Sequence, residues 1–308
     1  MHEAVQPFKI HILGCGSATP TLRHSSSSQI VEIRGKLFMI DCAEGTQTRL
    51  RLAHIHFAAI NNIFISHLHG DHCLGLFGML STFGLLGRTA PMHIYATAEL
   101  KEALDTFMRI ICPNLGYEVC FHPINTTVCK TIYKDRSVSV STLPLDHRVP
   151  CCGFLFKENP TLPHIRRDAI DAYGIPLSMI NSIKRGSAYT TPEGDIIPNE
   201  RLTTPADPPR SYAYCSDTRY CPKLPELIRG VNVLYHESTY GKDCAELAAK
   251  FGHSTACEAA MTARDAAVGR LVIGHFSARY EDESVLLNEA QEIFPRSVLA
   301  NEMMVIDV

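Results

Sequence analysis

The sequence predicts an α/β fold on the basis of three observations. The first half is rich in short apolar strands, the second half alternates strands and helices, and glycine turns separate several of these elements. The chain has 308 residues, of which 45% are hydrophobic and 20% charged, so it has ample apolar material for a core. Length alone would allow two domains, but one large α/β domain that carries an insertion fits equally well.

Strands dominate the part of the chain before residue 157. Short alternating or apolar runs predict strands there, and longer amphipathic or densely apolar runs predict helices. Gly35 separates the second and third strands, which indicates an antiparallel hairpin. The expected strands are Phe8–Leu13, Gln29–Arg34, Lys36–Asp41, Asn62–Ser66, Met92–Tyr95 and Ser137–Ser141, and the expected helices are Gly45–Leu52, Cys73–Leu86 and Ala98–Ile111.

The last hundred residues alternate strands with helices. Ser254 has the side chain and the position of a helix N-cap, immediately before a helical run. The expected strands are Tyr212–Ser216, Val231–Tyr235, Leu271–Gly274 and Met304–Asp307, and the expected helices are Thr255–Ala267 and Ser284–Ile293. Residues 157–210 are weakly patterned and dense in proline, so we expect an inserted arm within a single domain 1–308, against the alternative of a tolerated surface insertion.

Composition narrows the class of protein. No apolar run approaches the roughly 18 residues of a membrane span, and the N-terminus lacks a secretory pattern, so a cytoplasmic protein without a membrane contact is expected. The twelve cysteines show no zinc-ribbon spacing, and free, mostly buried thiols are expected. The net charge of −3 does not indicate a nucleic-acid binder, so any nucleic acid would have to be held by local basic patches.

A dense group of metal-binding residue types follows the strand that ends at Ser66. His67 and His69 occupy alternate positions of an extended segment, so both side chains can reach one metal ion. The turn that follows brings Asp71 and His72 to a second ion. Imidazole and carboxylate ligands suit zinc, and manganese or iron would also fit. A chance cluster of histidines at a strand end is the alternative.

Three further candidate ligands also follow apolar strands. They are His147, Asp217 and His275, and each could instead be a capping or core residue. Side chains from the ends of several strands meet at one edge of a sheet, where α/β proteins build active sites. Asp217 could bridge two ions. A pair of divalent ions roughly 3.5–4 Å apart can share a hydroxide and stabilise both oxygens of a phosphoryl displacement, which predicts hydrolysis of a phosphodiester.

An ordered set of motifs resembles a known family. The His-x-His-x-Asp-His segment with the later His, Asp and His resembles the metallo-β-lactamase superfamily. Within it, the chain closely resembles the ribonuclease Z family, the tRNA 3′-endonucleases, nearly from end to end. The motifs that carry this resemblance are Gly14-Cys-Gly-Ser-Ala-Thr-Pro20, Asp41-Cys-Ala-Glu-Gly45, Ser66-His-Leu-His-Gly-Asp-His72, Ser216-Asp-Thr-Arg219, His236-Glu-Ser-Thr239, His253-Ser-Thr255 and Gly274-His-Phe-Ser277.

The resemblance implies a four-layer αβ/βα sandwich of two mixed sheets and a homodimer. It implies a zinc-dependent endoribonuclease that cleaves the 3′ trailer from precursor tRNA by metal-activated water and leaves a 3′-hydroxyl on the tRNA. Two zinc ions per chain are implied, and Asp71 would also accept a proton from the attacking water. Position by position, one ion would be bound by His67, His69, His147 and Asp217, and the other by Asp71, His72, Asp217 and His275.

Two further residues are candidates for proton transfer. His253 could donate a proton to the leaving oxygen, and Glu237 could orient it. The alternative for His253 is a residue that merely begins a helix.

The inserted segment matches the position of the family's tRNA-binding arm, with one departure. The arm usually carries a Gly-Pro motif, and this chain has none. Its basic residues occur as local pairs, Arg166-Arg167 and Lys184-Arg185, and we take Lys184 and Arg185 as candidate substrate contacts. A solvated charged face is the alternative for such pairs.

Rival functions remain open at this point. A small-molecule hydrolase of the same superfamily, such as a lactonase or a cyclic-nucleotide phosphodiesterase, would use a similar metal site. A binding module with a residual metal site would lack a ligand, but all candidate ligands are present. A di-iron flavin enzyme would need a flavin-binding domain, for which the chain has no room.

Overall fold

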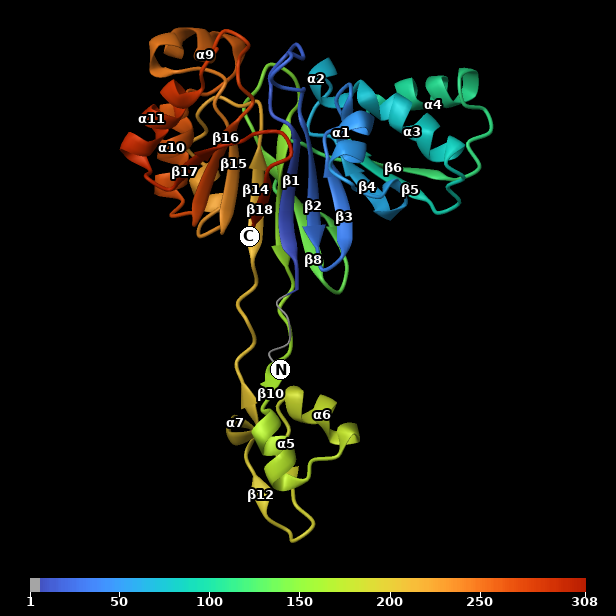
Figure 1. The fold of residues 1–308 in the computed structure, drawn as a ribbon, viewed down its shortest axis with the longest axis vertical. Helices are drawn as coiled ribbons and strands as arrows, with labels where there is room; N and C mark the ends of the chain where they lie inside the picture. Colours follow the sequence, from blue (N-terminus) through green and yellow to red (C-terminus); the bar gives the residue numbers. More distant parts are fainter. Residues whose placement is uncertain (1–5) are drawn as a thin grey trace. The chain divides into compact units, whose positions relative to one another are not determined.

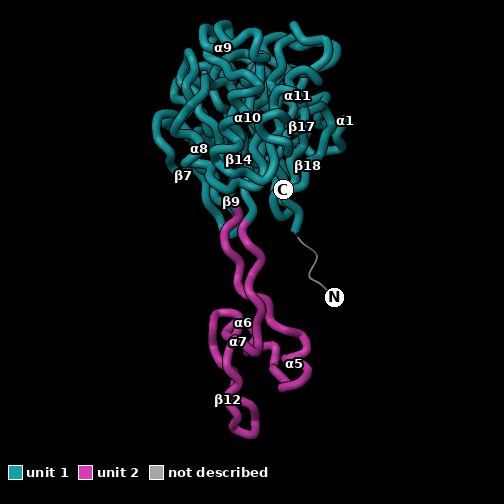
Figure 2. Tube along the Cα trace, turned by 90° about the vertical axis from the view of Figure 1, so that its left-hand side faces the viewer, with its two compact units in different colours: residues 1–157, 210–308 teal, residues 158–209 magenta. Residues whose placement is uncertain are grey.

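The computed structural model describes residues 6–308, and these residues form two compact units. Of the described residues, unit 1 contains 6–157 and 210–308, and unit 2 contains 158–209 (Figure 2). None of the helices in the described part of the chain has the length and apolarity needed to cross a bilayer.

Unit 1 is built on two seven-stranded mixed sheets (Figure 1). In spatial order, the first sheet contains β18 (Val305–Asp307), β1 (Phe8–Gly14), β2 (Ser28–Ile33), β3 (Lys36–Ile40), β4 (Ile60–Phe64), β5 (Met92–Ala96) and β6 (Val119–Pro123). The second contains β17 (Ser297–Leu299), β16 (Arg270–Gly274), β15 (Val233–Glu237), β14 (Ser211–Cys215), β9 (Cys152–Glu158), β8 (Val138–Pro144) and β7 (Thr131–Lys134).

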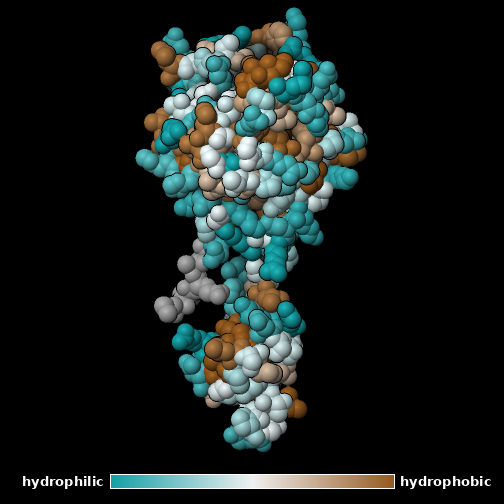
Figure 3. All heavy atoms as spheres, turned by 90° about the vertical axis from the view of Figure 1, so that its right-hand side faces the viewer, coloured by the Kyte–Doolittle hydropathy of each residue, from teal (hydrophilic) through white to brown (hydrophobic). Residues whose placement is uncertain are grey.

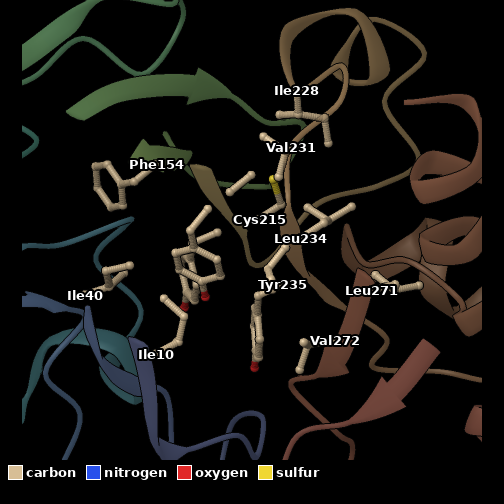
Figure 4. Close-up of a cluster of buried hydrophobic side chains, with 14 of the residues drawn as sticks. Ile10, Ile40, Phe154, Cys215, Ile228, Val231, Leu234, Tyr235, Leu271 and Val272 are labelled. Atoms are coloured by element: carbon tan, nitrogen blue, oxygen red, sulfur yellow. The ribbon is translucent and has the colours of Figure 1, made fainter. Parts of the chain in front are cut away.

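The two sheets enclose the main apolar core. In Figure 4, Ile10 and Ile40 from the first sheet lie across from Phe154 and Tyr235 of the second. Aromatic rings cross the interface, with the centroids of Phe64 and Phe154 5.5 Å apart. Alternating strand residues therefore meet in the middle of the unit, as packed sheets require.

Helices cover the outer faces of both sheets. On the first sheet lie α1 (Thr46–Leu52), α2 (Gly70–Cys73), α3 (Gly75–Leu85) and α4 (Leu100–Ile110), together with the 3₁₀ turn η1 (Phe57–Ala59) (Figure 1). On the side of the second sheet lie α8 (Leu224–Leu227), α9 (Ala245–Phe251), α10 (Ala256–Asp265) and α11 (Ser284–Ile293), with η2 (Lys242–Cys244). Helix, sheet, sheet and helix are four layers, which confirms the expected αβ/βα sandwich.

Most expected elements are confirmed within two residues, and the expected N-cap of one helix needs correction. The antiparallel hairpin of β2 and β3 is present. The helix expected over 73–86 is present as α3, and the short helix α2 precedes it. The N-cap of α10 is Thr255 and not Ser254, because Thr255 forms a capping box with Glu258. The Ser254 hydroxyl instead donates to the Thr218 carbonyl oxygen at 2.6 Å.

Unit 2 has regular structure despite its weak sequence pattern. Two short antiparallel pairs join β10 (His164–Ile165) to β13 (Thr203–Thr204), and β11 (Tyr189–Thr190) to β12 (Ile196–Ile197). Three helices accompany them, α5 (Arg167–Tyr173), α6 (Leu177–Lys184) and α7 (Asn199–Leu202). A small core of its own holds the unit, formed by Ala169, Ile175, Ile183, Tyr189, Ile197 and Leu202.

Candidate metal centre and active site

The candidate ligands lie at the ends of strands from both sheets. His67 to His72 follow β4, His147 follows β8, Asp217 follows β14 and His275 follows β16 directly. The backbone of Asp217 and His275 has positive φ, 49° and 61°. Such a conformation is uncommon for residues other than glycine, although aspartate and histidine adopt it more readily than most, and it permits a sharp change of chain direction. The chain therefore turns sharply after these strands, at the point where the side chains are needed.

One group of ligand atoms is formed by His67, His69, His147 and Asp217. Nδ1 of His69 lies 3.1 Å from Nε2 of His67 and 3.2 Å from Nε2 of His147. Oδ2 of Asp217 lies 3.4 Å from Nε2 of His67 and 3.7 Å from Nε2 of His147. Four donor atoms from three parts of the sequence thus converge on one point.

A second group is formed by Asp71, His72 and His275. The Nε2 atoms of His72 and His275 lie 3.3 Å apart, and Oδ2 of Asp71 is 3.5 Å from the latter. The other oxygen of Asp217, Oδ1, lies 3.3 Å from Nε2 of His72 and 3.1 Å from Nε2 of His275. Asp217 therefore turns one carboxylate oxygen toward each group.

These separations fit a pair of metal ions. Ligands at 2.0–2.2 Å from a tetrahedral zinc ion lie about 3.3–3.6 Å from one another. The distances within both groups, 3.1 to 3.7 Å, fall close to this range. The structure thus brings together all seven residues expected as ligands, and their donor set suits two divalent ions that share the Asp217 carboxylate.

Hydrogen bonds hold the histidine rings in orientations that suit metal binding. Nδ1 of His147 donates to the Gly252 carbonyl oxygen at 2.6 Å, and Nδ1 of His275 lies 2.9 Å from the Thr239 hydroxyl oxygen. In each ring the other nitrogen, Nε2, faces the ligand group. Metal-binding histidines commonly have such a partner on the second nitrogen, because it sets the tautomer and the ring orientation.

Asp41 is a supporting residue to which sequence reasoning assigned no role. Its fully buried carboxylate accepts hydrogen bonds from Nδ1 of His72 at 2.7 Å, from the Tyr214 hydroxyl at 2.7 Å and from both the amide and hydroxyl of Ser66. It therefore links the first sheet, the second sheet and a ligand. The available signal was its place in the Asp-Cys-Ala-Glu-Gly motif directly after a strand.

Glu237 and His253 form a buried pair beside the ligand groups. Oε1 of Glu237 accepts from Nδ1 of His253 at 2.9 Å and from the Thr218 amide at 2.7 Å. Its other oxygen accepts from the Thr239 hydroxyl at 2.6 Å. Thr239, which sequence reasoning placed only within a motif, therefore connects this pair to the ring of His275.

The electrostatics differ between the ligand rings and His253. Burial lowers the pKa of His147 to about 4, so its ring is neutral at pH 7 and available to a cation. Burial also acts to lower the pKa of His253, but the charge and the hydrogen bond of Glu237 outweigh it and raise the pKa to about 9. For Asp71, burial acts to raise the pKa, and the neighbouring His275 and His72 overcome it and hold the carboxyl pKa below its usual value. His253 is thus a protonated donor and Asp71 an ionised acceptor.

A pocket of about 560 Å³ opens onto this arrangement. Asp71, Asp217, His253 and His275 lie in its wall together with the signature loop, Ser17 to Pro20. The exposed cation in the same wall is Arg148, whose guanidinium lies over the ring of Phe251. A volume of this size is typical of sites for small molecules or a few groups of a larger one.

Lys184 and Arg185 belong to unit 2. Lys184 is the last residue of α6 and Arg185 is its C-cap, and the arginine is exposed. Cations at a helix C-terminus interact favourably with the helix dipole, so the structural alternative for this pair has a physical basis.

Comparisons with known proteins extend over the whole chain. Ribonuclease Z of Bacteroides fragilis is 53% identical over 304 residues, which cover 99% of this chain and 100% of that protein. Ribonuclease Z of Bacteroides thetaiotaomicron is 54% identical over 304 residues, with 99% and 96% covered. A family model described as "Anti-Pycsar protein Apyc1" matches residues 8–159.

Solved structures agree on the fold. The short form of human tRNase Z is similar with a TM-score of 0.69 at 24% identity, covering 97% of this chain and 98% of that one. The metallo-β-lactamase fold protein YhfI from Bacillus subtilis has a TM-score of 0.68 at 15% identity, with 98% and 100% covered. At these identities the likeness shows the metallo-β-lactamase fold and no more.

Proposed function

The chain belongs to the ribonuclease Z family, and we propose that it cleaves the 3′ trailer from precursor tRNA and leaves a 3′-hydroxyl on the tRNA. The observation that carries the proposal is the pair of ligand groups that share Asp217, with the Glu237–His253 pair beside them. Such a site supplies a place for two cations, an ionised acceptor and a protonated donor. Metal-assisted hydrolysis of a phosphodiester can use all three.

We propose two zinc ions per chain in this site. The first would be held by His67, His69, His147 and Asp217, and the second by Asp71, His72, Asp217 and His275. Manganese or iron would also suit nitrogen and oxygen ligands. When bound, such a pair supplies an activated water at neutral pH and neutralises charge on the phosphate. The burial that lowers the pKa of His147 to about 4, and the histidine neighbours that hold the pKa of the Asp217 carboxyl low against its burial, support this assignment.

The protein's own groups would transfer the protons. Asp71, kept ionised by its histidine neighbours, accepts a proton from the attacking water. Water adds to phosphorus and the bond to the 3′ oxygen of the tRNA breaks. His253, kept protonated by Glu237, donates a proton to that oxygen, which leaves as the 3′-hydroxyl. Arg148 at the pocket wall offers its charge to a neighbouring phosphate.

We assign unit 2 to binding the body of the tRNA. A pocket of about 560 Å³ can admit the nucleotides at the scissile bond and not a folded RNA, so contacts outside the pocket must supply the rest of the affinity. Lys184 and Arg185 are the proposed contacts, and phosphate recognition through them would not need the Gly-Pro motif.

A homodimer and a cytoplasmic location complete the proposal. A groove lies along α4, and Figure 3 shows apolar patches on the face of unit 1 that carries α3 and α4. The lining of the groove combines the apolar Phe77, Ala103, Phe107, Ile110 and Ile111 with Glu99, Glu102 and Thr106. Exposed apolar surface of this kind often contacts another protein, which supports a second copy of the chain as the partner. Twelve free cysteines suit the reducing conditions of the cytoplasm. Light scattering of wild type and Ile110→Glu tests the dimer, because a charge in the groove should yield monomers.

The function is tested with a 5′-labelled, 3′-extended precursor tRNA. Cleavage at the trailer junction is expected, with a product that can be ligated through its 3′-hydroxyl and with no cleavage after chelation. Restoring zinc should restore cleavage. A fully metallated protein that leaves the precursor intact would overturn the proposal.

The second candidate is a small-molecule phosphodiesterase of the same superfamily. The metal centre alone fits it as well, because the surrounding surface determines the substrate. Parallel assays with a cyclic nucleotide and with precursor tRNA separate the two. The ribonuclease assignment requires a much higher kcat/KM for the precursor, and the reverse order would favour the small molecule.

A further inference from the structure

A separate group of metal-binding residue types lies outside the catalytic site. It consists of Cys15, directly after β1, His24 in the loop before β2, and Glu302 in the turn before β18. Nδ1 of His24 lies 3.4 Å from Sγ of Cys15 and 3.0 Å from Oε2 of Glu302. Sγ of Cys15 lies 3.7 Å from Oε1 of Glu302. The group shares no residue with the catalytic ligand groups.

His24 has a carboxylate at each ring nitrogen, an arrangement that either a proton or a metal ion on the ring would satisfy. Its Nδ1 faces Glu302, and its Nε2 lies 3.3 Å from Oε1 of Glu283. A neutral imidazole has one N–H, so whichever nitrogen carries the proton, the lone pair of the other faces a carboxylate oxygen. An imidazolium would donate to both carboxylates, and the hydrogen bond to Glu302 raises the pKa of His24. A metal ion at Nδ1 fits the same geometry, with Nε2–H donating to Glu283. A carboxylate at the second ring nitrogen is the usual companion of a metal-binding histidine.

The donor atoms and their spacing suit zinc. One sulfur, one nitrogen and one carboxylate oxygen supply three protein ligands, which leaves the fourth position of a tetrahedral zinc ion to a water molecule. The separations of 3.0 to 3.7 Å are close to the about 3.3–3.7 Å between ligands of a tetrahedral zinc ion that includes sulfur. Cys15 is fully buried, so its thiol would ionise only with a cation bound, and binding would release the thiol proton to solvent.

We propose that Cys15, His24 and Glu302 bind a third zinc ion, which fixes the loop from Gly16 to Ser27. This loop forms part of the catalytic pocket wall. Its Ala18 amide donates to Oδ2 of Asp71 at 2.7 Å, and its Ser27 amide donates to the carbonyl oxygen of the same residue at 3.1 Å. The third ion would thus be structural, and it would order the loop that holds a catalytic carboxylate.

Cobalt(II) substitution tests this site without reference to activity. The catalytic groups offer only nitrogen and oxygen donors, so a near-ultraviolet thiolate-to-cobalt charge-transfer band reports a cysteine ligand. The metal-depleted full-length chain is titrated with cobalt(II). We expect the band in the wild type and its loss in Cys15→Ser. It should persist in Cys129→Ser, which alters an exposed thiol, and in Cys73→Ser, which alters a thiol close to the catalytic ligands.

Zinc content provides the second measurement. The zinc-loaded wild type should hold three ions per chain and Cys15→Ser should hold two. If the serine variant does not fold, Glu302→Gln replaces it, and its charge-transfer band should need more cobalt(II) to saturate. A wild type without the band, a band that survives Cys15→Ser, or equal zinc content would overturn the proposal. The cluster would then be a buried ion pair between an imidazolium and two carboxylates.

Discussion

The two units of the chain differ in where their polar groups lie. In unit 1 the histidines and carboxylates of the catalytic edge are buried or half-buried and lie close to one another. In unit 2 the interior is a small apolar core, and charged groups such as Arg166 and Asp168 pair on the surface. Among residues 6–308, every group able to hold a metal lies in unit 1. We therefore expect changes at the catalytic edge of unit 1 to alter turnover, and changes at the charged surface of unit 2 to alter only substrate binding.

The largest effect is expected from Asp217→Asn. An amide cannot supply two anionic oxygens, so both ions should be lost or weakened, and cleavage should fall well beyond the roughly 10–100-fold typical of supporting residues. Zinc content and cleavage of precursor tRNA are measured together. Asp105→Asn is the matched control, because that carboxylate is exposed and pairs only with Lys101. Normal zinc content and turnover in Asp217→Asn would refute the shared-ligand arrangement.

The next effect is expected from His253→Ala. Loss of a general acid typically costs about 10²–10⁴ in rate, here in kcat with the metal content unchanged. The measurement is single-turnover cleavage beside a zinc assay. If turnover were unchanged while both ions remained, His253 would have no part in the mechanism.

Glu237→Gln tests the role of His253 as general acid through the pH dependence of kcat. Glu237 raises the pKa of His253 to about 9 from an ordinary 6.5, so the acid form is lost only as the pH rises through the raised value. Without the negative charge the pKa falls, and the alkaline decline of kcat should begin at lower pH. Bound cations would lower the pKa of His253 in the wild type and in the variant alike. The informative quantity is therefore the difference between the two pH profiles. Superimposable pH profiles would contradict a role for Glu237 as the partner that sets this pKa.

A smaller effect is expected from Asp41→Asn. The carboxylate orients His72 and makes no contact with the substrate pocket, so a loss of roughly 10–100-fold in metal affinity or activity is typical. Excess zinc should restore much of the cleavage, because the ligands themselves are intact. Failure of zinc to restore it, with the fold verified by circular dichroism, would mean that Asp41 acts by another route.

The ligands could be predicted from sequence because each follows a strand and has a residue type that metals prefer. His147, Asp217 and His275 are far apart in sequence, yet strand ends bring them together. Asp41 and Thr239 could not be assigned roles, since an acid or a hydroxyl after a strand is unremarkable until its partners are known. Ser254 was misassigned because two adjacent hydroxyl residues both fit an N-cap, and the choice depended on Glu258 and on a distant carbonyl.

The smallest effect on kcat is expected when charged residues of unit 2 are replaced. These variants also test most directly whether the two units have different roles. Lys184→Ala and Arg185→Ala should raise KM for precursor tRNA and leave kcat unchanged, because these residues lie outside the catalytic unit. Each lost phosphate contact should also reduce the slope of log K against log salt concentration by about one.

Arg264→Ala is the control for this pair, because Arg264 is an exposed cation on the outer helix α10 of unit 1. It should leave both KM and the salt slope at wild-type values. An unchanged salt slope in Lys184→Ala and Arg185→Ala would mean that neither residue contacts tRNA and that both are only solvated charges at the end of α6. A fall in kcat would contradict the assignment of catalysis to unit 1 and of binding to unit 2, because it would mean that unit 2 contributes to the chemical step.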